Sequence, residues 1–427
     1  MDYSVVRKVL IDSFKFDSID YERAEVLTLA YDTDRSFLYQ GKYYSPLVDT
    51  PQDDLETRGT HCVSVSRIIS TIKGGLSHGN ARAPEGRFAR ALITKRLKGV
   101  LQRGRYPFSG MEESIWADIL DVTGAKKVIG MQPSRELCAA AHKRGVWVAD
   151  VQHGVVAEQH PWYGEEFRAA EPREQLPDAF LCWDRGSERV TNVWAKARGI
   201  DTIPIGNRWL ARFLRPDPHD QLANDVLGKY ARDAARLPNR RKTILVSLSW
   251  GEYTIPNGFI IDALERVIRK TSGEYLWLIR LHPNQLKGFA TQEKARFVRY
   301  FESALQGHAD WEVATKYPLP VILKHVDMHI SWSSSVCIEA AQSGVKSALM
   351  DARLKLPIYD RYYEYYRGIG MVQMIEPTEA DLDAWIARNS ISRLPPEDYT
   401  EFDRAYSKLI EFLATPGSAS NPQAILS

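Results

Sequence analysis

Short apolar runs alternate with helical patterns along most of this chain. In the stretch 326–351, the apolar run 328–332 meets three serines, then a helical segment that ends at Gly344, then a second apolar run. This order of strand, turn, helix and strand favours parallel sheets, because right-handed crossovers place helices on both faces of such a sheet. The alternation therefore predicts an α/β protein.

The alternation falls into two halves. A polar, proline-rich stretch at 215–219, a helical segment and a second polar stretch indicate a linker between about 207 and 242. In the first half we predict strands at 26–31, 127–131, 146–152, 179–183 and 202–205, with helices at 135–144 and 187–197. In the second half we predict strands at 243–249, 276–281, 311–314, 328–332 and 346–350, with helices at 258–270, 292–305, 320–324 and 336–343. The prediction is two doubly wound, Rossmann-like domains.

Composition limits the classes of function. The 427 residues are 44% hydrophobic, enough for two domains, and the net charge of +2 gives no global field for nucleic acid. The cysteines lie far apart and form no CxxC motif, so neither a zinc site nor a disulfide framework is expected. No apolar run approaches the roughly 20 residues that span a bilayer, and the N-terminus lacks the pattern of a signal peptide. We expect a cytoplasmic protein that contacts a membrane only at its surface.

Two histidines follow predicted strands directly. His153 follows the run 146–152 and precedes Gly154, and His282 follows the run 276–281. Open α/β sheets bind ligands at the carboxyl ends of their strands. An imidazole there can donate to phosphate oxygens or act as a general base. The alternative for each residue is a structural histidine packed at a strand end.

The serine turn is a candidate phosphate site. Ser333, Ser334 and Ser335 precede a predicted helix, where unpaired N–H groups and the helix dipole favour an anion. One serine would suffice as an ordinary N-cap. Glu339 lies one helical turn beyond Ser335 and could accept hydrogen bonds from a ribose diol, or lie in solvent or a salt bridge.

A second loop of this kind follows the run 243–249. It carries Ser249 and Gly251, which could face phosphate, and Trp250, which could form a wall. A single glycine also suits an ordinary turn.

The stretch 82–105 is strongly basic, with Glu85 as its only acidic residue. Four of its cations are interleaved with apolar residues and could dock on anionic lipid or guide an anionic acceptor: Arg90, Lys95, Arg96 and Lys98. The alternative is a solvated helix packed on its domain.

Three motifs occur in an order that resembles a known family. QHG at 152–154, RLHP at 280–283 and SWSSSVCIEAAQSG at 331–344 resemble motifs of GT-B glycosyltransferases of bacterial surface polysaccharide synthesis. Nearest in pattern are polysialyltransferases, capsule and O-antigen Kdo transferases and CDP-glycerol glycerophosphotransferases. The resemblance covers about residues 126–351 and implies a GT-B fold, in which two Rossmann-like domains face a cleft. His153 stands where polysialyltransferases have an acidic residue, which leaves CMP-Kdo, CDP-glycerol and other nucleotide sugars open as donors.

The resemblance also implies roles for residues. His153 would be the catalytic acid/base, and His282 and the serine turn would hold the phosphate of the donor. Arg280, which lies in the second motif, is placed with them as a residue that binds the donor nucleotide. If the reaction retains configuration through a covalent intermediate, a carboxylate is required. The candidates for that carboxylate are Asp150, Glu158 and Glu252.

These inferences give one expected function. Residues 1–214 would form an acceptor-side domain, 215–385 a domain binding the nucleotide donor, and 386–427 helices that cross back to the first domain. The chain would move a sugar from a CMP- or CDP-linked donor to a growing bacterial surface polysaccharide or lipid-linked glycan, at the inner face of the membrane. We expect no metal or cofactor, because no DxD motif or clustered set of His, Cys and Asp ligands stands in a loop where the donor is expected to bind. The alternatives are a GT-B-like nucleotide-sugar epimerase and a non-catalytic glycan-binding protein.

Overall fold

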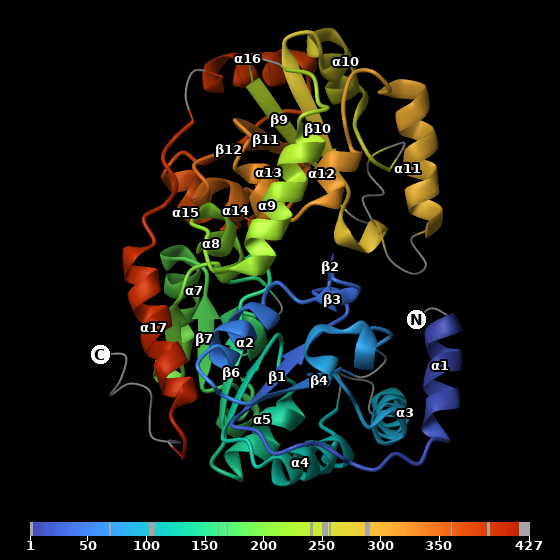
Figure 1. The fold of residues 1–427 in the computed structure, drawn as a ribbon, viewed down its shortest axis with the longest axis vertical. Coiled ribbons are helices and arrows are strands. Elements are labelled where there is room, and N and C mark those ends of the chain that lie inside the picture. The colour runs from blue at the N-terminus through green and yellow to red at the C-terminus, as the bar shows by residue number, and fades with distance from the viewer. Residues whose placement is uncertain are drawn as a thin grey trace. The chain divides into compact units, whose positions relative to one another are not determined.

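The chain forms a mixed α/β protein in the computed structural model, which describes residues 3–67, 70–101, 107–160, 162–168, 170–239, 242–249, 255, 258–286, 291–359, 361–390 and 393–417. It divides into two compact units. Unit 1 is Met1–Arg208 with Thr400–Ser427, and unit 2 is Trp209–Tyr399. Each unit is built on a sheet of parallel strands, as the alternating pattern predicts (Figure 1).

The sheet of unit 1 has six strands in the order β4-β1-β5-β6-β7-β8. Its strands are β1 (Val26–Ala30), β4 (Cys62–Ser66), β5 (Lys127–Gly130), β6 (Trp147–Val151), β7 (Ala179–Cys182) and β8 (Asp201–Pro204). A separate antiparallel hairpin joins β2 (Phe37–Tyr39) to β3 (Lys42–Tyr44). The helices of unit 1 are α1 (Tyr3–Ser13), α2 (Asp49–Glu56), α3 (Glu85–Leu101), α4 (Gly110–Thr123), α5 (Arg135–His142), α6 (Glu165–Arg168), α7 (Arg185–Ala195) and α17 (Thr400–Ala414).

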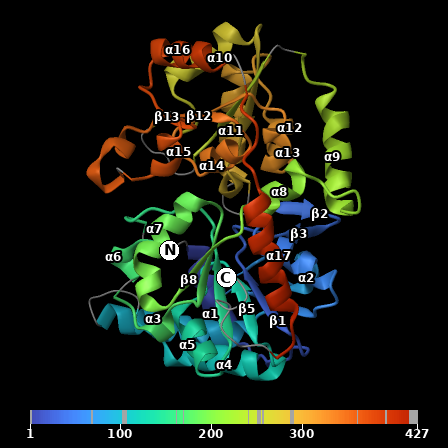
Figure 2. The same ribbon diagram turned by 90° about the vertical axis from the view of Figure 1, so that its left-hand side faces the viewer.

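Helices cover both faces of this sheet. Successive strand residues point to opposite faces, so Leu27 and Val128 pack against α3, α4 and α5, while Val26 and Ile129 pack on the side of α17. Figure 2 shows α17, in red, beside these strands. The ammonium of Lys127 donates to the carbonyl of Phe412, 2.7 Å away in the last turn of α17. The C-terminal helix is therefore part of unit 1.

The sheet of unit 2 has five parallel strands in the order β10-β9-β11-β12-β13. They are β9 (Lys242–Ser247), β10 (Tyr275–Arg280), β11 (Met328–Ser331), β12 (Lys346–Leu349) and β13 (Val372–Met374). The helices are α8 (Arg208–Leu214), which starts at the last residue of unit 1, then α9 (Gln221–Ala234), α10 (Asp262–Thr271), α11 (Thr291–Ala304), α12 (Glu312–Lys316), α13 (Leu319–Leu323), α14 (Val336–Gln342), α15 (Glu364–Gly368) and α16 (Glu379–Asn389).

In both sheets the strand order reverses at the first strand of the unit, which lies between the next two sheet strands of the chain. In unit 1 the chain runs from β1 to β4 on one side and then to β5 on the other, and in unit 2 it runs from β9 to β10 and then to β11. Loops after the two strands at such a reversal diverge to opposite faces and leave a crevice at the carboxyl edge, where doubly wound sheets bind ligands. Ligand-binding sites are therefore expected beyond the carboxyl ends of β1 and β5 and of β9 and β11.

One predicted strand is wrong. Residues 312–314 form the start of α12 and Trp311 is its N-cap, because the Asp310 carboxylate accepts a hydrogen bond from the backbone N–H of Val313, 2.9 Å away, and this bond favours a helical turn. Only Asp310 bridges to β10, through Leu278. The region expected to be a linker contains the expected helical segment, α9, and also a helix that was not predicted, α8, with the proline-rich residues between them.

Cys62, Cys138, Cys182 and Cys337 are buried and unbridged, and burial raises the pKa of the Cys62 thiol to about 12. Within the ranges that the structure describes, no helix is long and apolar enough to cross a membrane.

Candidate functional site

His153 lies just beyond the carboxyl end of β6, on a segment fixed by Gln152. The side-chain oxygen of Gln152 accepts from the backbone N–H of Trp183 at 2.7 Å, and its amide donates to the hydroxyl of Ser187 at 3.0 Å. Gln152 is buried, whereas the His153 side chain is half-buried. The buried anchor thus holds the histidine at the ligand-binding edge of the sheet.

Both ring nitrogens of His153 have partners. Nδ1 lies 2.5 Å from the hydroxyl of Tyr163, which also accepts from the backbone N–H of His153 at 3.0 Å. Nε2 lies 2.7 Å from the side-chain nitrogen of Gln132, beyond the end of β5. Neither partner was a predicted site residue.

The surroundings of His153 keep its ring neutral. Burial lowers the pKa of His153 to about 3, and the nearby His160 and Arg67 act in the same direction. Arg67 follows β4, lies over the ring of Tyr31 beyond β1, and donates to the carbonyl of Gln132 at 2.5 Å. Loops after β1, β4, β5 and β6 therefore converge at the point where the strand order reverses.

Asp150 is fully buried within β6 and already holds two donors. Its carboxylate accepts from the backbone N–H of Gln132 at 2.9 Å and from the indole of Trp162 at 2.5 Å. Burial raises the pKa of Asp150 to about 6. These contacts fit a structural carboxylate better than a nucleophile that must reach substrate. Glu158 is half-buried in the loop between β6 and α6, and Glu252 lies outside the described residues.

In unit 2, the loops after β9 and β11 are joined by Ser249 and Ser333. The hydroxyl of Ser249 donates to the carbonyl of Ser333 at 2.8 Å and accepts from its backbone N–H at 3.3 Å. These bonds lie where the strand order of unit 2 reverses. Trp250 and Gly251, which follow Ser249, lie outside the described residues.

The three serines of the turn have different surroundings. Ser334 accepts from the backbone N–H of Val336 at 3.3 Å at the start of α14, and Ser333 hydrogen-bonds to the side chain of Tyr363. Ser335 is the N-cap residue of α14 but makes no side-chain cap, and within the described ranges its hydroxyl has no hydrogen bond. Ser335 is therefore the serine whose hydroxyl is available to a ligand.

His282 follows β10 and opens a short 3-10 turn, η5 (Pro283–Gln285). Its Nδ1 accepts from the backbone N–H of Asn284 at 3.1 Å, and its own backbone N–H donates to the side chain of Gln285 at 2.8 Å. Because Nδ1 is an acceptor, the proton of the neutral ring lies on Nε2. This tautomer presents a donor, as a phosphate-binding role requires.

Arg280 and Glu339 belong to the same part of unit 2. The guanidinium of Arg280 donates to the carbonyl of Ala314 and, at 2.7 Å, to that of Tyr317, at the end of α12. Burial lowers the pKa of Arg280 to about 10, and Glu339, half-buried on α14, opposes that shift. In this arrangement Arg280 fastens α12 to β10, and its predicted contact with the donor remains a prediction.

The basic helix α3 contains two kinds of cation. Arg90 donates to the carbonyls of Ser13 and Lys15 at 2.8 and 2.9 Å. Lys95 is paired with Glu136 at 2.8 Å and Glu112 at 3.1 Å. Both cations are therefore engaged in contacts within unit 1. Two others, Arg96 and Lys98, are exposed, as are the apolar side chains of Leu97 and Val100 between and beyond them.

The exposed end of α3 gives a test of membrane contact. Replacing Arg96 and Lys98 with Gln should weaken binding to anionic vesicles by roughly 25-fold, since each basic residue near an anionic surface contributes about 1 kcal/mol. Co-sedimentation at about 0.05 M and 0.5 M salt measures this loss and its screening. Arg388→Gln with Arg404→Gln, two exposed arginines on α16 and α17, is the matched control. Equal binding by the two double variants would leave α3 an ordinary solvated helix.

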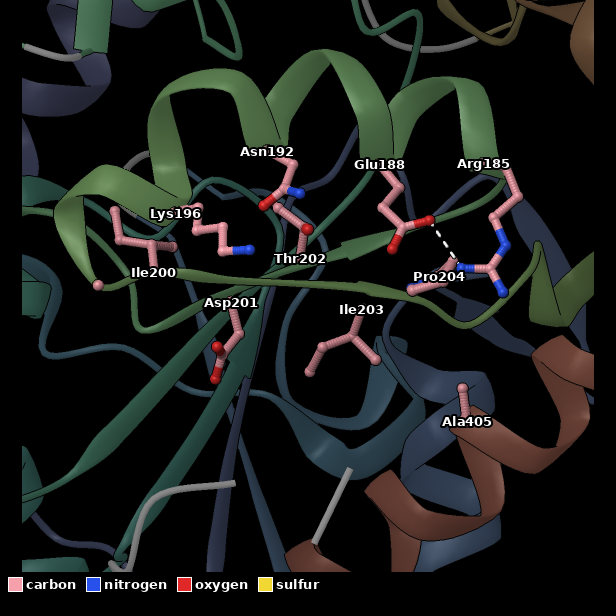
Figure 3. Close-up of a pocket in the computed structure, with 11 residues that line it drawn as sticks. Arg185, Glu188, Asn192, Lys196, Ile200, Asp201, Thr202, Ile203, Pro204 and Ala405 are labelled. Carbon is pink, nitrogen blue, oxygen red and sulfur yellow. Dashed lines mark hydrogen bonds and ion pairs between the residues drawn. The ribbon is translucent and has the colours of Figure 1, made fainter. Parts of the chain in front are cut away.

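A pocket of about 620 Å³ lies between α7 and the edge strand β8 (Figure 3). Two basic and two acidic residues line it, Arg185, Lys196, Glu188 and Asp201, and Arg185 donates to Glu188 at 2.8 Å. None of the predicted site residues lines this pocket. Among the described residues, no group of three or more His, Cys, Asp or Glu side chains is arranged to hold a metal ion.

Comparisons with known proteins identify the fold. No family model matches the chain, and no curated protein matches it. Among solved structures, the wall teichoic acid polymerase TagF is 11% identical, with 97% of each chain covered and a TM-score of 0.53. The UDP-GlcNAc 2-epimerase from Methanocaldococcus jannaschii is 8% identical, with 91% of this chain and 99% of that chain covered and a TM-score of 0.54. The enzyme from Neisseria meningitidis, bound to UDP-GlcNAc, is 10% identical, with 90% and 98% covered and a TM-score of 0.53.

These likenesses and the two parallel sheets establish a GT-B fold with Rossmann-like domains. At such low identity they establish the fold alone.

Proposed function

We propose that this chain is a glycosyltransferase that moves a sugar, or a sugar-like alditol phosphate, from a nucleotide donor to a glycan acceptor. The observation that carries the proposal is the neutral imidazole of His153, held by both ring nitrogens where the strand order of unit 1 reverses. A neutral imidazole at a ligand-binding edge suits removal of a proton from a hydroxyl group.

In the proposed reaction, His153 takes the proton of the acceptor hydroxyl through Nε2. A base with a pKa of about 3 would be weak, but a negatively charged substrate beside the ring would favour the imidazolium and raise that pKa. A bacterial surface polysaccharide or lipid-linked glycan is the proposed acceptor. Contact of the exposed end of α3 with anionic lipid would bring the protein to such an acceptor.

The proposed donor site lies at the carboxyl edge of unit 2. His282 and Ser335 would donate to the phosphate oxygens and stabilise the charge that develops on the leaving phosphate. The bonds between Ser249 and Ser333 would hold the two loops in place for that contact. A CMP- or CDP-linked donor is favoured by the motif resemblance, and a TagF crystal was soaked with CDPG.

The donor site predicts a loss of nucleotide affinity in two variants. His282→Ala and Ser335→Ala should each weaken the complex by roughly 10- to 150-fold, since a charge-assisted hydrogen bond contributes about 1.5 to 3 kcal/mol. Titration calorimetry with the cognate nucleotide measures both losses. His308→Ala and Ser303→Ala, elsewhere on unit 2, are the matched controls. Affinities equal to those of the controls would contradict the donor site.

A second candidate is a nucleotide-sugar epimerase, because the UDP-GlcNAc 2-epimerases match the fold as well as TagF does. Thermal shift with CMP, CDP, UDP and GDP tests the proposal first, since a ligand of the folded state raises the melting temperature. The proposal expects the largest shift with a cytidine nucleotide. A shift with UDP alone would favour the epimerase, and no shift with any nucleotide would favour a non-catalytic glycan-binding protein.

A further inference from the structure

The backbone of Gln132 adopts a conformation that its residue type disfavours. Gln132 follows β5 with φ at 50°, in the left-handed region where residues with a side chain are uncommon. A glycine would adopt this conformation without strain. Strained residues of this kind gather at functional sites, so the side chain at this position calls for an explanation.

Gln132 has three contacts with the charged and titratable groups of the candidate site. Its backbone N–H donates to Asp150 at 2.9 Å, and its carbonyl accepts from Arg67 at 2.5 Å. Its side-chain nitrogen lies 2.7 Å from Nε2 of His153. A glycine could make the two backbone contacts equally well. The contact with His153 is the one that requires the side chain.

The hydrogen bonds around His153 define a tautomer. The amide nitrogen of Gln132 can only donate, so Nε2 is the acceptor and carries the lone pair. The proton of the neutral ring then lies on Nδ1 and is donated to the hydroxyl oxygen of Tyr163 at 2.5 Å. Tyr163 is buried and cannot move easily, which fixes the ring on that side. Only the Nε2 side can exchange its partner for a substrate.

We propose that Gln132 is a positioning residue, whose side-chain amide holds His153 as the Nδ1–H tautomer with the Nε2 lone pair toward the substrate. When the acceptor binds, its hydroxyl group displaces the Gln132 amide from Nε2. The displacement rests on the proposed function, whereas the positioning does not. In the reaction, the proton moves from the hydroxyl oxygen to Nε2 while Nδ1 keeps its own proton. The ring becomes an imidazolium that still donates to Tyr163.

Other groups act on the same ring. Tyr163 and His160 lie on the segment after β6, and Arg67 lies after β4. The backbone of Val151, the last residue of β6, hydrogen-bonds to the ring and favours its protonated form. Asp150 lies within β6 and is linked to the ring through Gln132. Replacing the Gln132 side chain leaves the chemical identity of all these groups unaltered. A change in His153 can then be assigned to the amide.

The test uses nuclear magnetic resonance of the full-length protein with labelled histidine, without substrate. Nitrogen shifts report which ring nitrogen carries the proton, and His153→Ala identifies the signals among the 10 histidines. We expect the Nδ1–H tautomer in the wild type and its loss in Gln132→Gly. In Gln132→Glu, a carboxylate beside Nε2 should favour the imidazolium and raise the pKa of His153 by about one unit or more.

Gln40→Gly is the matched control. Gln40 has φ at 48° in the exposed turn between β2 and β3, so the two glycine substitutions relieve the same backbone strain. We expect the two variants to melt at similar temperatures, with only Gln132→Gly altering the His153 signals. A merely structural role predicts the opposite pattern: a lower melting temperature for Gln132→Gly and unchanged His153 signals. That result, or an Nε2–H tautomer in the wild type, would overturn the proposal.

Failure of the proposed function has a different signature. The tautomer of His153 could change in the Gln132 variants although no donor and acceptor react. That result would support the positioning role of Gln132 and contradict the assignment as a transferase. Where transfer is observed, Gln132→Gly should lower turnover at least tenfold with nucleotide affinity unchanged, and Gln40→Gly should match the wild type. Equal turnover in the two glycine variants would also overturn the positioning role.

Discussion

His153→Ala should lower the rate of transfer to the acceptor by roughly 10²- to 10⁴-fold, the range for loss of a general base. Nucleotide affinity should stay close to that of the wild type, because the proposed donor contacts belong to unit 2. Steady-state kinetics with saturating acceptor measures turnover, and calorimetry measures affinity. In this variant the rate of transfer should therefore fall while the nucleotide affinity does not.

His61→Ala is the control for that experiment, since His61 is an exposed histidine of unit 1. It should behave as the wild type in both measurements. Equal transfer rates for His153→Ala and His61→Ala would show that His153 is not the base. A retaining reaction through a covalent intermediate would then need a carboxylate, and Glu158 is the described candidate that has not been assigned a structural role.

Lys95→Met should destabilise unit 1 by about 3 to 5 kcal/mol, because it removes the cation that is hydrogen-bonded to two buried carboxylates. The side chains of Glu136 and Glu112 are only 1% and 7% exposed, and Lys95 is paired with both. Methionine keeps most of the length of the side chain, so the loss reports the charge. Urea unfolding followed by tryptophan fluorescence measures the effect.

Lys98→Met, on the exposed part of the same helix, is the control and should change stability by less than about 0.5 kcal/mol. Glu136→Gln combined with Lys95→Met should recover part of the lost stability, since it removes one uncompensated charge. Equal urea midpoints of unfolding for the two lysine variants would contradict the structural role of Lys95. Lys95 would then again be a candidate for contact with the membrane.

Local sequence patterns predicted most of the sheet strands because a buried parallel strand is a continuous apolar run. The runs that end before His153 and His282 could be placed at strand ends for the same reason. The strand at 62–66 was missed, although its alternation of apolar residues and serines is itself a strand pattern, because the prediction relied on continuous apolar runs. Residues 311–314 read as a strand locally, but the carboxylate of Asp310 started a helix there.

Long-range contacts were beyond the reach of these patterns. Lys95 had the spacing of a surface cation, and its partner Glu136 lies 41 positions away in the sequence. Gln132 follows a predicted strand just as His153 does, which was the one available signal, yet an amide carries no chemistry that would single it out. Its strained backbone and its contact with His153 became visible only in three dimensions.

Transfer itself is the most direct test of the proposed function. CDP-glycerol and CMP-Kdo, each with the label in the transferred group, would be incubated with the wild-type protein and a glycan acceptor, beside UDP-GlcNAc without acceptor. The proposed function predicts label in the acceptor from one of the cytidine donors, strongly reduced in His153→Ala, and unchanged UDP-GlcNAc. Epimerised UDP-GlcNAc in the absence of acceptor, with no label transferred from either cytidine donor, would contradict it.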